Sequence, residues 1–304
     1  MSDESPCGKA LYGLAGWAYD DWVGIVYPQP LPRGFDSIAY LARYFDALEI
    51  NSSFYRIPSR RTAEAWARAA APLRGFEFAV KLWQGLTHAR DAFDEAGAQA
   101  FETALAPLCD AGKLGAILIQ FPWSFRATAD SKAWLERLLE RFARYPLAVE
   151  VRHASWLAGD WLLEQLRARG AAFCNIDQPA LRDCIGLTDL ATAGHAYLRV
   201  HGRNSRNWFR QTAAGHERYD YFYSAEEIAD LAAAVRSLKK KARRLYVIAN
   251  NHWRGQAPAN ALQLKAAAEG ARTEAPECLI RHFGGLGPAI RPSRDAGGEQ
   301  MELF

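Results

Sequence analysis

The sequence predicts a single (β/α)8 TIM-like barrel, in which eight parallel strands close into a cylinder surrounded by helices. Eight short, apolar, β-rich segments recur along the chain, and segments with the apolar spacing of amphipathic helices lie between them. This alternation indicates parallel strands with crossover helices. Eight such units in roughly 250 residues are the size of one barrel. An open doubly wound sheet is the alternative, but no G-x-G-x-x-G motif follows the first strand segment.

Each expected strand is a mostly apolar run that is short enough for a strand and bounded by polar or turn residues. In chain order the strands are residues 11–16, 47–51, 76–81, 115–121, 147–152, 171–176, 196–201 and 245–250. The expected helices are rich in Ala, Leu, Glu and Arg, which favour helices, and cover residues 38–45, 62–71, 93–108, 131–144, 161–169, 225–241 and 259–268. Residues 178–194 show no convincing helical pattern, and residues 202–223 form a long loop. Loops of that length are usually functional or mobile.

The domain organisation follows from these patterns. We expect a disordered N-terminus over residues 1–10, one barrel domain over residues 11–283, and a flexible tail over residues 284–304. The beginning of this tail is rich in Gly and Pro and lacks periodicity.

The composition excludes several classes of protein. Half of the 304 residues are apolar and 23% are charged, which is ordinary globular usage and excludes collagen, a disordered chain and a disulfide-rich miniprotein. The apolar runs are shorter than the roughly 20 residues that cross a bilayer, so we expect a cytoplasmic protein with no membrane contact. The five cysteines are scattered and indicate reduced thiols. The net charge of +3 does not by itself predict a polyanionic partner.

Polar residues gather where the expected strands end, which is the end of a barrel that carries catalytic groups. They are Glu49, Asn51, Lys81, Gln120, Glu150, Arg152, His153, Asn175, Asp177, Arg199, His201, Asn250, Asn251 and His252. Burying many ionisable groups is costly unless they pair, bind a metal or bind a ligand. The cluster therefore predicts a functional site. The alternative is a structural ion-pair network, such as Glu150 with Arg199.

Several blocks of the sequence resemble the YecE-like family of TIM barrels. They are GLAGWAYDDWVGIVYP, LEINSSFYRIPS, FAVKLWQGLTH, YLRVHGRN, RYDYFYS and NNHWRGQAPANALQL, in that order between Leu11 and Ala268. The resemblance implies an eight-stranded barrel and little about activity, because the family is chiefly a domain of unknown function. It implies shared polar positions at Glu49, Asn51, Tyr55, Lys81, His201, Asn250 and His252.

Three chemistries suit this cluster. A divalent metal would use the carboxylates and imidazoles of Glu49, Glu150, Asp177, His201 and His252. A metal-free anion pocket would use Arg254 and the helix amides that follow Asn251, because barrels often bind phosphate after strands seven and eight. Lys81 would form a Schiff base in an aldolase-like enzyme, although an ion-paired lysine is the more frequent explanation.

The long loop after the seventh strand interleaves basic and aromatic residues: Arg203, Arg206, Arg210 and Arg218 with Trp208, Phe209, Tyr219, Tyr221 and Tyr223. Guanidinium groups bind phosphates and aromatic rings stack on bases, so the loop suits a nucleic-acid strand. It equally suits a lid that packs on the barrel. The run Lys239–Lys241 is expected to be the solvated end of a helix.

The chain ends in Gln300-Met301-Glu302-Leu303-Phe304, which resembles the short motif with which bacterial replication and repair proteins bind the DNA sliding clamp. Leu303 and Phe304 would be adjacent apolar anchors, and Gln300 and Met301 complete the predicted partner-binding segment. The alternative is a tail that folds back and buries Phe304 on the barrel.

Together these patterns predict a phosphodiester- or nucleic-acid-processing hydrolase that is recruited to DNA by its tail. The expected catalytic residues are Glu49, Lys81, Glu150, His201 and His252. The expected substrate-binding residues are Trp17, Asn51, Tyr55, Arg152, Asp177, Arg199, Arg203, Trp208, Asn250, Asn251 and Arg254. Two alternatives stay open: a non-catalytic nucleic-acid-binding adaptor on the clamp, and a carbohydrate or sugar-phosphate enzyme that uses the paired carboxylates Glu49 and Glu150.

Overall fold

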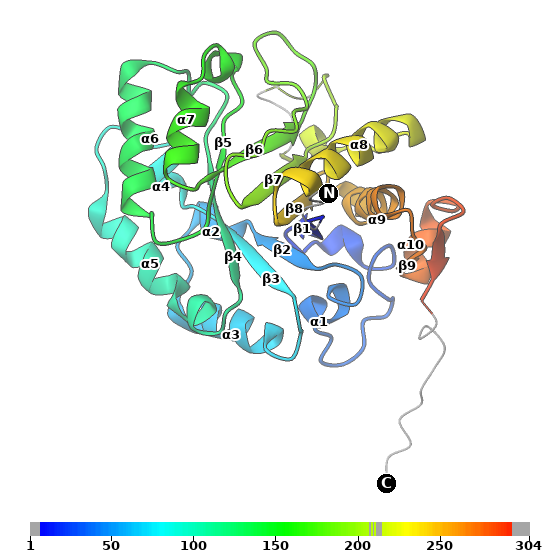
Figure 1. Cartoon of the computed structure of the whole chain (residues 1–304). Helices are drawn as coiled ribbons and strands as arrows, with labels where there is room; N and C mark the ends of the chain where they lie inside the picture. The colour runs from blue at the N-terminus through cyan, green and yellow to red at the C-terminus, as the bar shows by residue number, and fades with distance from the viewer. Residues whose placement is uncertain (1–6, 207, 209, 211–214, 294–304) are drawn as a thin grey trace, which may run out of the picture.

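Eight parallel strands close into a barrel in chain order, which confirms the predicted fold (Figure 1). The computed structural model describes residues 7–206, 208, 210 and 215–293. The strands are β1 Lys9–Ala15, β2 Ala47–Ile50, β3 Glu77–Lys81, β4 Leu114–Gln120, β5 Leu147–Glu150, β6 Ala172–Asp177, β7 His195–Val200 and β8 Arg244–Ala249. Each pairs in parallel with the next, and β8 pairs with β1.

Helices surround this barrel (Figure 1). They are α1 Ser37–Leu41, α2 Ser52–Tyr55, α3 Arg60–Ala70, α4 Gln84–Thr87, α5 Glu95–Asp110, α6 Ala129–Arg141, α7 Trp161–Ala168, α8 Ala225–Lys241, α9 Gln256–Glu269 and α10 Glu277–His282. Local sequence fixes several helix starts: Ser224 and Glu227 form a capping box at α8, and the Thr128 hydroxyl accepts from the Ser131 amide at α6. As predicted, residues 178–194 contain no helix.

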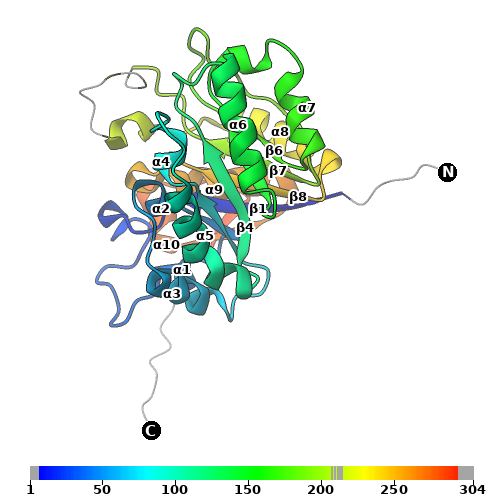
Figure 2. The ribbon, with the colours of Figure 1, turned by 90° about the vertical axis from the view of Figure 1, so that its left-hand side faces the viewer.

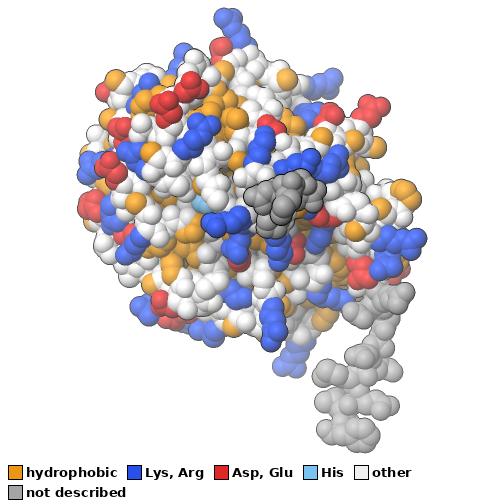
Figure 3. Space-filling model, viewed as in Figure 1, with side chains coloured by type: hydrophobic (Ala, Val, Ile, Leu, Met, Phe, Trp, Pro, Cys, Tyr) orange, Lys and Arg blue, Asp and Glu red, His pale blue; other side chains and the backbone are white. Residues whose placement is uncertain are grey.

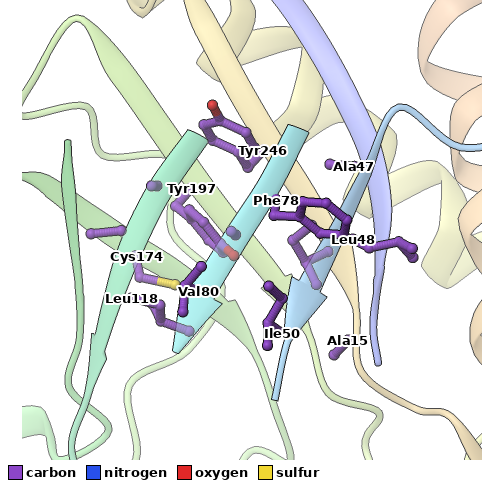
Figure 4. Packing of buried hydrophobic residues seen from close by; sticks show 14 of the residues in the cluster. Ala15, Ala47, Leu48, Ile50, Phe78, Val80, Leu118, Cys174, Tyr197 and Tyr246 are labelled. Carbon is purple, nitrogen blue, oxygen red and sulfur yellow. The ribbon is translucent and has the colours of Figure 1, made fainter. Parts of the chain in front are cut away.

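Strand alternation decides which side chains enter the barrel. Tyr197 of β7 pairs in register with Tyr246 of β8, and their rings stack inside the barrel with centroids 5.6 Å apart (Figure 4). The same parity places Arg199 on the inner face, two residues beyond Tyr197. The neighbouring outward positions, such as Leu198 and Val247, pack against the helices. Side chains therefore fill the barrel around Tyr197 and Tyr246, and the charged residues enter it nearer the C-terminal ends of the strands.

The predicted tail begins too early in the sequence. Residues 284–293 do not extend from the domain, because β10 (Ile290–Pro292) pairs in parallel with β9 (Thr273–Ala275). The Ser293 amide also donates to the carbonyl of Ala275 over 3.1 Å. The return is made by a turn with positive φ at Gly285 and Gly287, at 111° and 102°, which glycine adopts without strain. Glycines that predicted a linker are turn residues here.

The two ends of the barrel are distinct. In Figure 2, α2 and α4, which follow β2 and β3, lie to the left, whereas β1 begins on the right. The loops after the strands therefore gather at the left-hand end. In the part of the chain that the structure describes, none of the helices is both long and apolar enough to cross a membrane.

Candidate functional site

A pocket of about 530 Å³ opens at the C-terminal ends of the strands. This volume falls within the range of small-molecule sites. Its lining comes from strand ends, from the segments that follow them and from α3: Gly16, Trp17, Ala18, Tyr19, Asn51, Ser52, Tyr55, Trp66, Lys81, Arg152, Arg199, Tyr219, Asn250 and His252. Among these lining residues there are three cationic side chains and no Asp or Glu. The pocket therefore offers guanidinium, ammonium and amide donors to a ligand, and the carboxylates that balance Arg152 and Arg199 lie outside its lining.

Beneath the pocket, Arg199 joins two buried carboxylates. Its Nη2 donates to Glu49 Oε1 over 2.6 Å, and its Nη1 donates to Glu150 Oε2 over 2.7 Å. Tyr197 donates to the second oxygen of Glu49 over 2.8 Å, and Arg152 Nε donates to the second oxygen of Glu150 over 2.8 Å. The ion pair of Glu150 with Arg199, which the sequence suggested as an alternative, is therefore present in the structure. Burial alone would raise the pKa of Glu150, but Arg199 and Arg152 hold that pKa well below its usual range.

His201 belongs to this buried network. It is fully buried, and its Nε2 lies 3.3 Å from Glu150 Oε1. Asn250 Nδ2 contacts His201 Nδ1 at 2.9 Å. Burial lowers the pKa of His201 to about 3 despite the opposing effect of Glu150. These three predicted catalytic residues, His201, Glu49 and Glu150, lie outside the pocket lining. We assign Glu49 and Glu150 to positioning Arg199 and Arg152, and His201 to supporting Glu150.

Lys81 differs from the other charged residues of the site. It is the last residue of β3, it lines the pocket, and its Nζ lies 3.9 Å from the centroid of the Phe54 ring. Ser53 Oγ holds the strand end by donating to the carbonyl of Lys81 over 2.7 Å. In the described structure Lys81 Nζ has no hydrogen bond to, or ion pair with, a carboxylate. Burial, followed by the nearby Arg199, lowers the pKa of Lys81 to about 7.

Aromatic rings form the walls of the pocket: Trp17, Tyr19, Tyr55, Trp66, Tyr219 and His252. Trp17 and Trp66 meet edge to face, with centroids 6.1 Å apart. His252 stacks on Tyr19 at 4.5 Å with an interplanar angle of 8°. Tyr55 is 70% exposed at the mouth. Flat faces next to cations suit a ligand that has both a ring and an anionic group.

Asp177 and Arg203 form a separate site on the outside of the barrel. Ile176, not Asp177, pairs with the inward-facing Arg199, so alternation turns Asp177 toward the helices. There it accepts from Arg203 Nη2 over 2.7 Å and from Tyr223. Asp177 and Arg203 therefore lie outside the predicted pocket: strand parity turns Asp177 outward, and Arg203 follows it by donating to its carboxylate.

Three further predicted binding residues also lie outside the lining. Asn251 is buried and donates to the carbonyl of Tyr221 over 2.8 Å and to Asn260 over 2.9 Å. The backbone amide of Arg254, which has a φ of 47°, donates to Asp21 Oδ2 over 2.6 Å. Trp208 is buried against Arg152, with its ring 5.5 Å from the guanidinium carbon. These three residues therefore stabilise the loops and do not line the pocket.

The five residues predicted as metal ligands do not form a metal centre. Glu49 and Glu150 are joined to Arg199, and Asp177 faces the opposite side of the sheet. Among the described residues, no group of three or more His, Cys, Asp or Glu side chains is placed to hold a metal ion. The donor set therefore does not fit the predicted divalent metal, because arginines already occupy the carboxylate oxygens.

Other predicted features fall partly outside the described residues. Phe209 and the segment 294–304, with Gln300, Met301, Leu303 and Phe304, are not described. The solvated helix end is described: Lys239 pairs with Glu269 and Lys241 with Asp189, each at 2.6 Å. On the face shown in Figure 3, Lys and Arg side chains are interspersed with Asp and Glu. The cationic groups that would bind an anionic ligand are therefore those that line the pocket.

The sequence did not indicate Gly16, Ala18, Tyr19, Ser52 and Trp66 as lining residues, and it indicated Tyr219 only as an aromatic residue of the seventh loop. Trp66 lies on α3 and Tyr219 on a short 3-10 helix, Gly215–Tyr219. The high tryptophan content and the aromatic residues of the seventh loop were the available signals. Neither signal locates a ring in space, because a helix or loop residue reaches the pocket only through tertiary packing.

Fold and site together define the class: this is a TIM-barrel protein with a ligand-sized, cationic and aromatic pocket at the C-terminal ends of its strands. The chain belongs to the family described as "Protein of unknown function DUF72", which matches residues 11–279. The YecE-like resemblance is compatible with that family.

Several relatives share the whole barrel. The UPF0759 protein YunF of Bacillus subtilis (strain 168) is 28% identical over 265 residues, which are 83% of this chain and 92% of YunF. A DUF72 family protein of Thermotoga maritima MSB8 is 34% identical with a TM-score of 0.74, over 86% of this chain and 99% of that one. A DUF72 family protein of Enterococcus faecalis V583 is 25% identical with a TM-score of 0.75, over 86% and 96% of the two chains.

Proposed function

We propose that the pocket binds a phosphate-bearing nucleoside unit and that the protein is an enzyme that processes nucleic acid at that unit. The observation that carries the proposal is the lining itself: Lys81, Arg152 and Arg199 supply positive charge, and aromatic walls stand beside them. Guanidinium and ammonium groups bind phosphate. Stacking on aromatic side chains binds bases without requiring one sequence.

The ordered guanidinium groups in the floor of the pocket favour this ligand. Arg199 is almost fully buried and held by Glu49 and Glu150, and Arg152 is held by Glu150. Preorganised cations stabilise an anion without paying the entropy of ordering long side chains. A lysine with a strongly perturbed pKa in a cleft is typical of catalytic sites, and it supports an enzyme over a passive binding module.

The carbohydrate alternative receives less support from the same geometry. Glycosidases usually need two carboxyl groups flanking the sugar, one on each side of the scissile bond. Glu49 and Glu150 are both fully buried, and one arginine bridges them. A sugar in the pocket would therefore meet cations and amides rather than this acid pair.

A binding titration tests the proposal. Tryptophan fluorescence is followed during titration with a deoxynucleoside 5′-monophosphate, the matching nucleoside and inorganic phosphate. We expect the monophosphate to bind best, and Lys81→Met with Arg152→Met to weaken it more than the nucleoside. Equal affinity for nucleoside and monophosphate would contradict the proposed role of the cations. Oligonucleotides incubated with the full chain then separate an enzyme from the adaptor alternative, which predicts binding without turnover.

Recruitment to DNA is a second part of the proposal. It is supported by the sequence Gln300-Met301-Glu302-Leu303-Phe304 alone, whose adjacent apolar pair has the form of a short peptide anchor. Docking on a bacterial sliding clamp would bring the pocket to replicated or repaired DNA. The pocket and the tail are independent, so either part of the proposal can fail without the other.

A further inference from the structure

Lys81 places an amino group in the pocket, but in the described structure no carboxylate pairs with it, although a buried ammonium needs such a partner. The two carboxylates nearest the pocket floor, Glu49 and Glu150, are already matched by two guanidinium groups, those of Arg199 and Arg152. These four charges balance. A charged Lys81 would therefore be an additional buried cation, and charges buried without a partner are strongly disfavoured.

The surroundings of Lys81 shift its side chain from the ammonium toward the neutral amine. Burial and Arg199 lower its pKa to about 7, so a substantial fraction of the side chain carries a free lone pair near neutral pH. Phe54 covers one side of Nζ at 3.9 Å, and the pocket is on the accessible side. A desolvated lysine next to other cations is the arrangement in which an amine acts as a nucleophile.

We infer that Lys81 is a nucleophile that forms an imine with the aldehyde carbon of a phosphorylated, ring-opened sugar held in this pocket. The inference depends on the proposed function, because Arg152 and the floor of the pocket would bind the phosphate and orient the aldehyde. It names the substrate as a carbonyl compound, which phosphate binding alone does not require.

The step balances without a metal or a redox partner. The Nζ lone pair attacks the aldehyde carbon; one proton moves from this nitrogen to the carbonyl oxygen, a second proton comes from solvent, and the oxygen leaves as water. A C=N bond replaces the C=O bond. Because the product iminium is positive, the phosphate of the same ligand supplies the anion that Lys81 otherwise lacks.

Such an aldehyde has two sources with the same chemistry. One is an abasic deoxyribose within a DNA strand, whose ring-opened form carries an aldehyde between two phosphates. The other is a free sugar phosphate, such as deoxyribose 5-phosphate. The aromatic walls would contact a base that flanks an abasic site, whereas a free sugar phosphate leaves the walls uncovered.

Reductive trapping tests the inference. The full-length protein is incubated in separate arms with an abasic-site oligonucleotide and with stoichiometric deoxyribose 5-phosphate, each with sodium borohydride. Hydride adds to the imine carbon and leaves a stable secondary amine. We expect one adduct in intact-mass analysis, mapped to Lys81 by peptide sequencing. The arm that reacts identifies the source of the sugar.

Three variants make the outcome decisive. Lys81→Arg and Lys81→Met are expected to lose the adduct, whereas Lys240→Met, which changes an exposed lysine, is expected to keep it. An adduct that maps to another lysine, or one that persists in both Lys81 variants, overturns the inference. If neither arm gives an adduct while wild type and Lys81→Arg still bind a deoxynucleoside 5′-monophosphate, the imine is overturned and the proposed binding function stands. If that binding is also lost, the proposed function fails with it.

Discussion

Lys81 Nζ lies 3.9 Å from the centre of the Phe54 ring, and in the described structure it contacts no carboxylate. The two residues come from adjacent parts of the barrel rim, because Ser53 Oγ ties the start of α2 to the carbonyl of Lys81. An aromatic face is a weak substitute for a carboxylate. A charged Lys81 therefore lowers the stability of the folded protein.

Lys81→Met should stabilise the protein at neutral pH. The unfolded chain has a lysine pKa near 10.4, whereas the folded pKa is about 7. Between these pH values the unfolded state binds the additional proton, so wild-type stability rises with pH. The gain from Lys81→Met is therefore largest below pH 7, about 1–4 kcal/mol, and shrinks toward pH 10. Urea unfolding at pH 6.5 and 9.5 measures it.

The control for this comparison is Lys240→Met, which removes an exposed lysine. Its unfolding free energy should stay close to that of wild type at both pH values, because surface substitutions rarely change it by more than about 0.5 kcal/mol. A Lys81→Met variant that is less stable than wild type at pH 6.5 would show that the ammonium has a partner.

Glu150→Gln should be strongly destabilising. Glu150 accepts from Arg199 over 2.7 Å and from Arg152 over 2.8 Å while fully buried. Removing one partner of a buried ion pair leaves an uncompensated charge, which costs about 3–5 kcal/mol. Chemical denaturation measures the loss. Glu64→Gln is the matched control, since the pair of Glu64 with Arg60 is exposed and worth less than about 1 kcal/mol. Equal losses of stability in the two variants would contradict a stabilising role of the buried network around Glu150.

Binding of a nucleoside monophosphate should weaken as pH rises through about 7. Lys81 is protonated below that pH and neutral above it, so the pocket loses one positive charge. Lys81→Arg stays charged throughout and should lose this part of the pH dependence, which separates it from the titration of the phosphate itself. Calorimetric titrations at pH 6 and pH 8.5 test this, and an unchanged pH profile in Lys81→Arg would argue against Lys81 as the titrating group.

Trp66→Leu should weaken the binding of a nucleotide more than that of inorganic phosphate. Trp66 forms part of the aromatic wall with Trp17, and stacking one base contributes about 1–3 kcal/mol. We expect a fall in nucleotide affinity of roughly tenfold and little change for phosphate. Parallel losses for both ligands would indicate that the variant disturbs the floor rather than the wall. Trp134→Leu, which changes an indole that bonds to the carbonyl of Leu86 outside the pocket lining, is the control.

Leu303→Ala/Phe304→Ala should abolish binding to a bacterial DNA sliding clamp while leaving the pocket unaffected. The two side chains are the proposed apolar anchors, and truncating anchors at the centre of a peptide interface removes most of its binding energy. Surface plasmon resonance with immobilised clamp measures it. Absence of binding by the wild-type chain would leave the pocket as the only support for nucleic acid as the substrate.

Much of this structure was predictable, because the barrel depends on periodicity. Strand segments such as residues 147–152 and 245–250 coincide with β5 and β8 within two residues, and the residues at the strand ends include Lys81, Arg152 and Arg199. The ion pair of Glu150 with Arg199 was expected as the structural alternative for the polar cluster, and the structure contains it.

The rest of the site depends on effects that a sequence does not display. Asp177 was misplaced because one residue of strand parity separates the inner face from the outer one. Trp66 was missed because its position follows from how α3 packs. The carboxylates suggested a metal, but their oxygens bind arginines. Whether a carboxylate binds a metal or an arginine depends on which charged side chains the fold brings next to it.

A crystal structure of the protein soaked with a deoxynucleoside 5′-monophosphate would show directly whether the pocket binds a nucleotide. We expect a phosphate oxygen within hydrogen-bond distance of Lys81 Nζ or Arg152, and a base against the rings of Trp17, Trp66 or Tyr219. A pocket without nucleotide at a concentration that saturates the protein in solution, or a nucleotide bound elsewhere on the surface, would contradict this expectation.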